Sequence, residues 1–94
     1  MSAKPRIVIY GSEYCTYCTA ARMLLKKKGL AFEDVLVSMD TAARQEMESR
    51  SGRTAVPQIF IDDESIGGFD ELYELAQSGQ LDHLLNSSAA TVEQ

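Results

Sequence analysis

The only two cysteines of this 94-residue chain lie three positions apart, at Cys15 and Cys18. Residues 7–10 before them are apolar and typical of a buried strand, and residues 19–25 after them are good helix formers. This order predicts a strand, a short loop and a helix that begins near Cys15. The first turn of a helix has unpaired N–H groups and a partial positive charge, which favour a thiolate. Cys15 is therefore the predicted nucleophile, and Cys18 is close enough to form a disulfide with it.

Length and composition are typical of one globular domain, with 45% hydrophobic and 24% charged residues. The net charge of −5 argues against nucleic acid as the main partner. No apolar run reaches the roughly 20 residues that span a bilayer, and residues 1–6 lack the apolar stretch of a secretory signal. We therefore expect a cytoplasmic monomer with no membrane partner. In a reducing compartment its two cysteines form a reversible redox pair rather than a permanent disulfide.

The rest of the chain alternates between strand and helix patterns, which indicates an α/β fold. Strands at residues 4–10 and 31–37 flank the first helix, at about residues 15–28, and such a βαβ unit makes its strands parallel. The further elements expected are a helix from Asp40 to about Arg50, strands at residues 55–61 and 65–67, a helix at 69–78 and a short helix around 81–85. We expect one domain over residues 1–85 and a flexible tail over residues 86–94.

A C-x-x-C pair near a βαβ pattern is typical of a thioredoxin-like redox motif. The competing interpretation is a structural metal site, which needs about four ligands. His83 is the only histidine and lies far from Cys15 and Cys18 along the chain. The sequence therefore favours redox chemistry, and no metal site is expected from one chain alone.

Pro57 stands near the start of the predicted strand at residues 55–61, where a proline is unusual. A cis bond between Val56 and Pro57 would turn the chain and direct the backbone groups of Val56 outward. An extended peptide could then pair with that backbone. A trans proline at the start of a strand is the alternative.

Gly67 and Gly68 precede the predicted helix at residues 69–78. Glycines let a backbone pass close to a ligand, and the free N–H groups of a helix start can hold a carboxylate. Asp70 would add a negative charge for an ammonium group. A ligand with a carboxylate and an ammonium at one end would fit this segment, and an ordinary turn with a helix cap is the alternative.

These three segments, in this order and spacing, resemble the glutaredoxin family. The matching residues are C-T-Y-C at 15–18, T-A-V-P at 54–57 and G-G-F-D at 67–70. The resemblance extends over residues 6–85 and is closest to small bacterial glutaredoxins with two active-site cysteines. It implies a thioredoxin fold, with a four-stranded mixed sheet flanked by helices.

The resemblance also implies glutathione as co-substrate, bound in a groove beside Cys15, and glutathionylated or disulfide-bonded proteins as substrates. Val56 is expected to pair its backbone with the cysteinyl part of glutathione, while Phe69 and Asp70 hold its γ-glutamyl end. The residues expected to contact glutathione are Tyr17, Arg53, Val56, Pro57, Gly68, Phe69 and Asp70. Gln58 or Arg44 is a further candidate, beside Arg53, for contact with the glycine carboxylate.

The chain departs from the family pattern at Thr16, where proline is common, and at Ser12, where many relatives have lysine. Some relatives without that proline hold a [2Fe–2S] cluster between two monomers, ligated by the first cysteine and glutathione. A cluster carrier with Cys15 as ligand is therefore the alternative function. The leading prediction is an oxidoreductase in which Cys15 attacks glutathione mixed disulfides and Cys18 resolves the intermediate.

Overall fold

Four strands form one mixed sheet in the order β2-β1-β3-β4. The structure is a computed structural model, and it describes residues 7–85. The elements are β1 (Ile7–Gly11), α1 (Thr16–Lys27), β2 (Glu33–Leu36), α2 (Thr41–Ser51), β3 (Gln58–Ile61), β4 (Glu64–Gly67) and α3 (Phe69–Ser78). β1 and β2 are parallel, whereas β1 with β3 and β3 with β4 are antiparallel. The predicted α/β thioredoxin fold with a four-stranded mixed sheet is confirmed.

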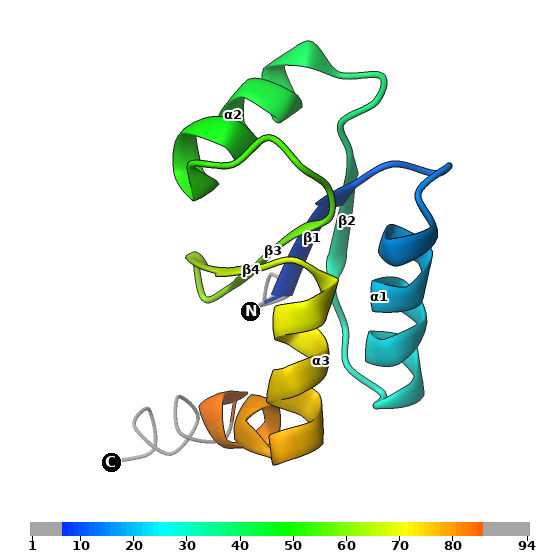
Figure 1. Cartoon of the computed structure of the whole chain (residues 1–94), viewed down its shortest axis with the longest axis vertical. Coiled ribbons are helices and arrows are strands. Elements are labelled where there is room, and N and C mark those ends of the chain that lie inside the picture. The colour runs from blue at the N-terminus through cyan, green and yellow to red at the C-terminus, as the bar shows by residue number, and fades with distance from the viewer. Residues whose placement is uncertain (1–6, 86–94) are drawn as a thin grey trace, which may run out of the picture.

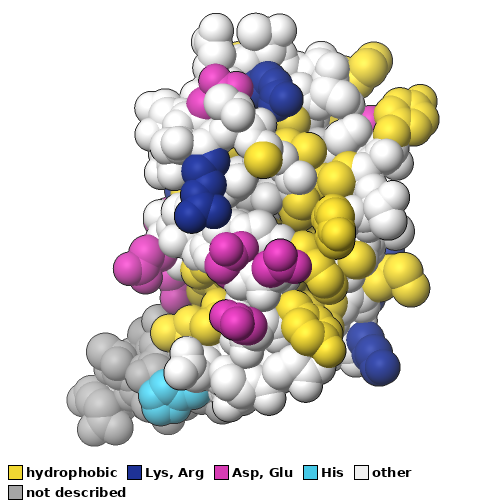
Figure 2. Space-filling view, viewed as in Figure 1, with side chains coloured by type: hydrophobic (Ala, Val, Ile, Leu, Met, Phe, Trp, Pro, Cys, Tyr) yellow, Lys and Arg dark blue, Asp and Glu magenta, His cyan; other side chains and the backbone are white. Residues whose placement is uncertain are grey.

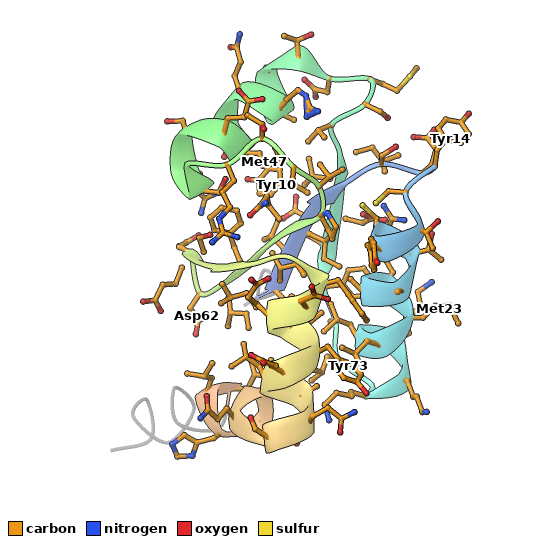
Figure 3. All side chains as sticks on the ribbon, in the orientation of Figure 1. Tyr10, Tyr14, Met23, Met47, Asp62 and Tyr73 are labelled. Carbon is orange, nitrogen blue, oxygen red and sulfur yellow. The ribbon has the colours of Figure 1, made fainter. Side chains whose placement is uncertain are left out.

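Helices cover both faces of the sheet (Figure 1), with α2 on one face and α1 and α3 on the other. Successive side chains of a strand point to opposite faces, so β1 contributes to two cores. Ile7 and Ile9 pack toward α1 and α3. Tyr10 packs with Met47 of α2 in the second core, as Figure 3 shows. β1 is therefore covered on both faces, as its apolar sequence predicts.

The helix ends follow the expected capping residues. The Asp40 carboxylate accepts a hydrogen bond from the Ala43 N–H at 3.0 Å, which caps the start of α2. Gly52 ends α2 in the left-handed conformation, with φ of 73°. α1 ends with Lys26 and Lys27 in its last turn, where cations are favourable. Residues 80–85 are also helical, so the short helix predicted there is confirmed.

Two predicted strands, at residues 31–37 and 55–61, are too long at their starts. β3 begins at Gln58 rather than at residue 55, because Pro57 has no N–H to donate to a sheet. β3 and β4 are joined by Asp62 and Asp63, whose φ angles of 52° and 70° are both positive, as in the mirror-image turns of tight hairpins. Residues 4–6 of the first predicted strand, and the predicted tail at 86–94, lie outside the described residues. Between residues 7 and 85, no helix is long and apolar enough to cross a membrane.

Candidate active site

Cys15 immediately precedes α1 and caps it. Its backbone is extended, with φ of −97° and ψ of 121°, and its Sγ accepts a hydrogen bond from the Cys18 N–H at 3.2 Å. The same Sγ lies 3.8 Å from the Val56 carbonyl oxygen. Cys15 is half-buried and carries a free thiol. The predicted nucleophile therefore stands at a helix N-terminus, beside the segment that leads into β3.

Cys18 is fully buried, and its Sγ accepts a hydrogen bond from the Ser12 N–H at 3.5 Å. Burial raises the pKa of the Cys18 thiol to about 11, and its hydrogen bond with Cys15 acts in the same direction. The hydrogen bond from Ser12 opposes this shift. At neutral pH Cys18 is therefore a protonated, inaccessible thiol, whereas Cys15 is the one that an external disulfide can reach.

Gly11 and Arg22 belong to this site, although the sequence analysis did not single them out. A Cβ atom on Gly11 would lie 2.8 Å from the Cys18 Sγ, so a larger residue there would collide with the sulfur. Arg22 donates from Nη2 to the Ser12 carbonyl at 3.2 Å, and its Nε lies 2.9 Å from Asp34 Oδ2. Arg22 follows Cys18 by four positions and so lies on the same face of α1. That spacing was the available signal.

A groove of about 270 Å³ lies beside Cys15. Its lining residues are Tyr17, Arg53, Ala55, Val56, Pro57, Gln58, Gly68, Phe69, Asp70 and Glu71. The fold thus brings together all seven residues that the resemblance assigned to glutathione. The Val56–Pro57 peptide bond is cis, as predicted. Gln58 also lines the groove, where its Nε2 donates to the Ala55 carbonyl at 2.9 Å, whereas Arg44 is not part of the lining and lies 3.9 Å from Glu48 on α2.

The start of α3 forms one wall of the groove. Glu71 Oε1 accepts a hydrogen bond from the Gly68 N–H at 2.8 Å, and this bond lowers the pKa of the Glu71 carboxyl. The side chain that bonds back to the N-cap residue Gly68 is that of Glu71, and not that of its neighbour Asp70. The position of Glu71 three residues after the N-cap was the missed signal. Asp70 is exposed on the groove wall and is left available to a ligand.

Aromatic side chains continue from the groove along α3. The ring centroids of Tyr17 and Phe69 are 6.0 Å apart, and those of Phe69 and Tyr73 are 5.8 Å apart. Figure 2 shows a band of hydrophobic side chains on this face of the molecule. Tyr14 is 88% exposed and lies at the tip of the loop before α1 (Figure 3). The surface near Cys15 therefore offers aromatic side chains as well as backbone groups that can form hydrogen bonds.

Residues 7–66 match the sequence model of the family described as Glutaredoxin. This chain belongs to the glutaredoxin family. It is 51% identical to glutaredoxin 3 of Escherichia coli K12 over 79 residues, which cover 84% of this chain and 95% of that protein. Its structure resembles a glutaredoxin of Brucella melitensis, with a TM-score of 0.74 and 42% identity, covering 89% of this chain and 91% of that one. As a glutaredoxin, the chain is a thiol–disulfide oxidoreductase.

The structural relatives include a buckwheat glutaredoxin solved in complex with glutathione. The TM-score is 0.80 at 25% identity, and the match covers 92% of this chain and 81% of the buckwheat chain. Among residues 7–85, no group of three or more His, Cys, Asp or Glu side chains could hold a metal ion. An iron–sulfur cluster at Cys15 would thus need ligands from outside one chain, and that alternative stays a prediction.

Proposed function

We propose that this glutaredoxin reduces glutathione mixed disulfides and protein disulfides at the expense of glutathione, with Cys15 as nucleophile and Cys18 as resolving thiol. One observation carries most of the proposal. The Cys15 Sγ lies 3.8 Å from the carbonyl oxygen of Val56, and Val56 lines the groove. A cysteinyl thiol held in that groove by the Val56 backbone would lie next to the Cys15 sulfur.

The first step is attack by the Cys15 thiolate on the glutathione sulfur of a mixed disulfide. The substrate–glutathione S–S bond breaks, a Cys15–glutathione disulfide forms, and the substrate leaves as a thiolate that takes a proton from water. A second glutathione thiolate then attacks the glutathione sulfur on Cys15. Glutathione disulfide leaves, and the Cys15 thiolate is restored.

The groove offers charged groups for both ends of glutathione. The first N–H groups of α3 have no intrahelical acceptors and can hold the γ-glutamyl carboxylate, while Asp70 can pair with the adjacent ammonium. Arg53 lines the same groove and can pair with the glycine carboxylate. The buckwheat relative solved in complex with glutathione supports glutathione as the ligand.

Two substitutions test the groove. Asp70→Asn and Arg53→Met should each raise the KM for glutathione by roughly tenfold, the scale of one lost charge-assisted hydrogen bond. Reduction of the same substrate by 2-mercaptoethanol, which lacks those charges, should be unaffected. Glu74→Gln on α3 and Lys27→Met on α1 are matched controls, because both side chains are exposed and lie outside the groove. Unchanged KM values in both groove variants would contradict the assignment.

The [2Fe–2S] carrier is the second candidate, favoured by Thr16 at the first position of α1 in place of proline. We infer that Cys15 and glutathione would be the ligands, shared between two copies of the chain. Anaerobic reconstitution with iron, sulfide and glutathione tests this candidate, with visible absorption and molecular mass as the measurements. A colourless monomer would argue strongly against a carrier and would agree with the monomeric state that we propose, together with a cytoplasmic location, for this chain.

A further inference from the structure

Arg22 connects the loop before Cys15, helix α1 and strand β2. Its side chain is only 15% exposed, its Nη2 donates to the Ser12 carbonyl at 3.2 Å, and its Nε lies 2.9 Å from Asp34 Oδ2. Ser12 in turn donates its N–H to the Cys18 sulfur at 3.5 Å. The Arg22 guanidinium therefore fixes Ser12, and Ser12 is in turn hydrogen-bonded to the Cys18 sulfur.

The guanidinium also lies beside the Cys18 sulfur. A Cβ atom built on Gly11 would be 2.8 Å from the Cys18 Sγ and 3.3 Å from Arg22 Nη2, so both groups occupy the same side of Gly11. The charged or titratable groups that act on Cys18 are the Cys15 thiol and the Arg22 guanidinium. Asp34, from β2, acts on that guanidinium as its counter-charge.

We propose that Arg22 is a positioning residue for the resolving step, holding the Ser12 loop against Cys18 and supplying the positive charge beside which Cys18 becomes a thiolate. This inference rests on the roles proposed above for Cys15 and Cys18. Asp34 opposes Arg22, because its carboxylate neutralises part of the same positive charge. Arg22 therefore favours ionisation of the buried thiol, and Asp34 weakens that effect.

The step that Arg22 assists is an intramolecular exchange. Cys18 loses its proton to water and attacks the Cys15 sulfur of a mixed disulfide. The bond between Cys15 and the outgoing thiol breaks, the Cys15–Cys18 disulfide forms, and the outgoing group leaves as a thiolate. No further oxidant is needed, because the mixed disulfide is reduced as the two cysteines are oxidised.

The Arg22 charge acts on a thiol whose ionisation burial opposes. In the reduced protein burial raises the pKa of Cys18 to about 11, and burial still opposes ionisation of Cys18 when Cys15 is in a mixed disulfide. Resolution therefore depends on a minor, ionised species. Arg22 lowers the pKa of Cys18 against this burial effect. Losing the Arg22 charge should raise the pKa of Cys18, which lowers the fraction of thiolate and makes each thiolate a better nucleophile. Because nucleophilicity changes less steeply with pKa than the thiolate fraction does, the attack should be slower overall.

Three substitutions separate charge from packing. Arg22→Met should slow resolution by roughly three- to tenfold below pH 8, on the scale of one lost opposite charge, and move the pH midpoint upward. Arg22→Lys retains the charge without the two-pronged geometry, and should recover the pH midpoint but only part of the rate. Asp34→Asn should accelerate resolution and move the midpoint downward. Lys26→Met removes an exposed charge one turn further along α1 and is the matched control.

The experiment is stopped-flow mixing of the full-length reduced protein with 5,5′-dithiobis(2-nitrobenzoate) across a pH series. Attack by Cys15 releases one coloured nitrobenzoate thiolate, and attack by Cys18 releases the second, whose rate reports resolution. Cys18→Ser should retain only the first release, which identifies the second. This probe does not use the glutathione groove, so its result is independent of whether glutathione binds there.

Opposite shifts in Arg22→Met and Asp34→Asn, with partial rescue by Arg22→Lys, would support the proposal. Equal slowing in Arg22→Met and Asp34→Asn, with an unchanged pH midpoint, would overturn it in favour of a packing role. Absence of a second release in the wild type would also overturn it, while glutathione-dependent turnover by Cys18→Ser would show that the groove still functions. If Arg22→Met does not fold, the opposed predictions for Asp34→Asn and Arg22→Lys decide the question.

Discussion

The Cys15 sulfur accepts a hydrogen bond at 3.2 Å from the backbone N–H of Cys18, so the nucleophile caps the helix that carries its partner. One group thus satisfies an N–H of the first turn that would otherwise lack an acceptor. The same contact keeps Cys18 close behind Cys15. One local hydrogen bond therefore joins the accessible cysteine to its buried partner.

The first prediction concerns alkylation. Iodoacetamide at pH 7 should modify Cys15 and leave Cys18 unmodified in the reduced protein, because Cys18 is inaccessible and its pKa is raised to about 11. Peptide mass spectrometry after a short reaction measures both sites. Urea-unfolded protein is the control, in which both cysteines should react. Comparable labelling of Cys18 in the folded protein would contradict the burial described here.

The second prediction concerns Gly11. Gly11→Ala should lower the free energy of unfolding by about 1–3 kcal/mol, the usual cost of overpacking, since the new Cβ would lie 2.8 Å from the Cys18 sulfur. Urea unfolding measures this loss. Combining it with Cys18→Ala removes the obstructing sulfur and should recover much of the loss. If the two costs simply add, the collision is not the cause.

The third prediction concerns acid stability. The pKa of Glu71 is lowered by its hydrogen bond from the Gly68 N–H, so its stabilising effect is present above the ordinary glutamate pKa of about 4.3 and is lost as pH falls through the lower folded value. Glu71→Gln keeps an oxygen acceptor for the Gly68 N–H but loses the negative charge, so it should be less stable than wild type at pH 7, by about 0.3–1 kcal/mol. The difference should shrink below pH 4. Thermal unfolding across pH, with Glu74→Gln as control, measures it, and a gap independent of pH would exclude this explanation.

The fourth prediction concerns the network beneath α2. The Tyr10 hydroxyl donates to Glu46 at 3.2 Å and accepts from Arg50 at 3.0 Å, and Arg50 lies 4.5 Å above the Phe60 ring. Tyr10→Phe should cost about 1 kcal/mol at pH 7.

Burial raises the pKa of Tyr10. The stability linked to this group is therefore present below the ordinary tyrosine pKa of about 10 and is lost as pH rises through the folded value. Tyr10→Phe should lack that alkaline loss. Unfolding at pH 7 and in the alkaline range measures both effects. An identical alkaline loss in wild type and variant would rule out Tyr10 as its source.

The fold was largely predictable because its signals are local. The apolar run of β1, the Asp40 cap and Gly52 each determine structure within a few residues of themselves. Boundaries were less accurate where pairing determines them. β2 extends only over Glu33–Leu36, the residues that pair with β1, although the sequence pattern extends over residues 31–37.

Site residues that belong to a sequence motif could be predicted. Site residues whose role depends on tertiary packing could not. Cys15 and Pro57 stand out in the sequence because their chemistry and conformation are unusual. In the sequence Gly11 looks like an ordinary loop glycine. Only the packing of β1 against α1 shows that the Cys18 sulfur leaves no room for a side chain at this position. Asp34 is an ordinary strand residue until its pairing with Arg22 is seen.

The central claim is glutathione-dependent catalysis through Cys15, and its most direct test is reduction of a small glutathione mixed disulfide, coupled to glutathione reductase and NADPH. Wild type should turn over rapidly, Cys15→Ser should lose at least 99% of that activity because no other accessible thiol lies at the groove, and Cys18→Ser should remain active. Loss of activity in Cys18→Ser alone, or no turnover by folded wild type, would contradict the account.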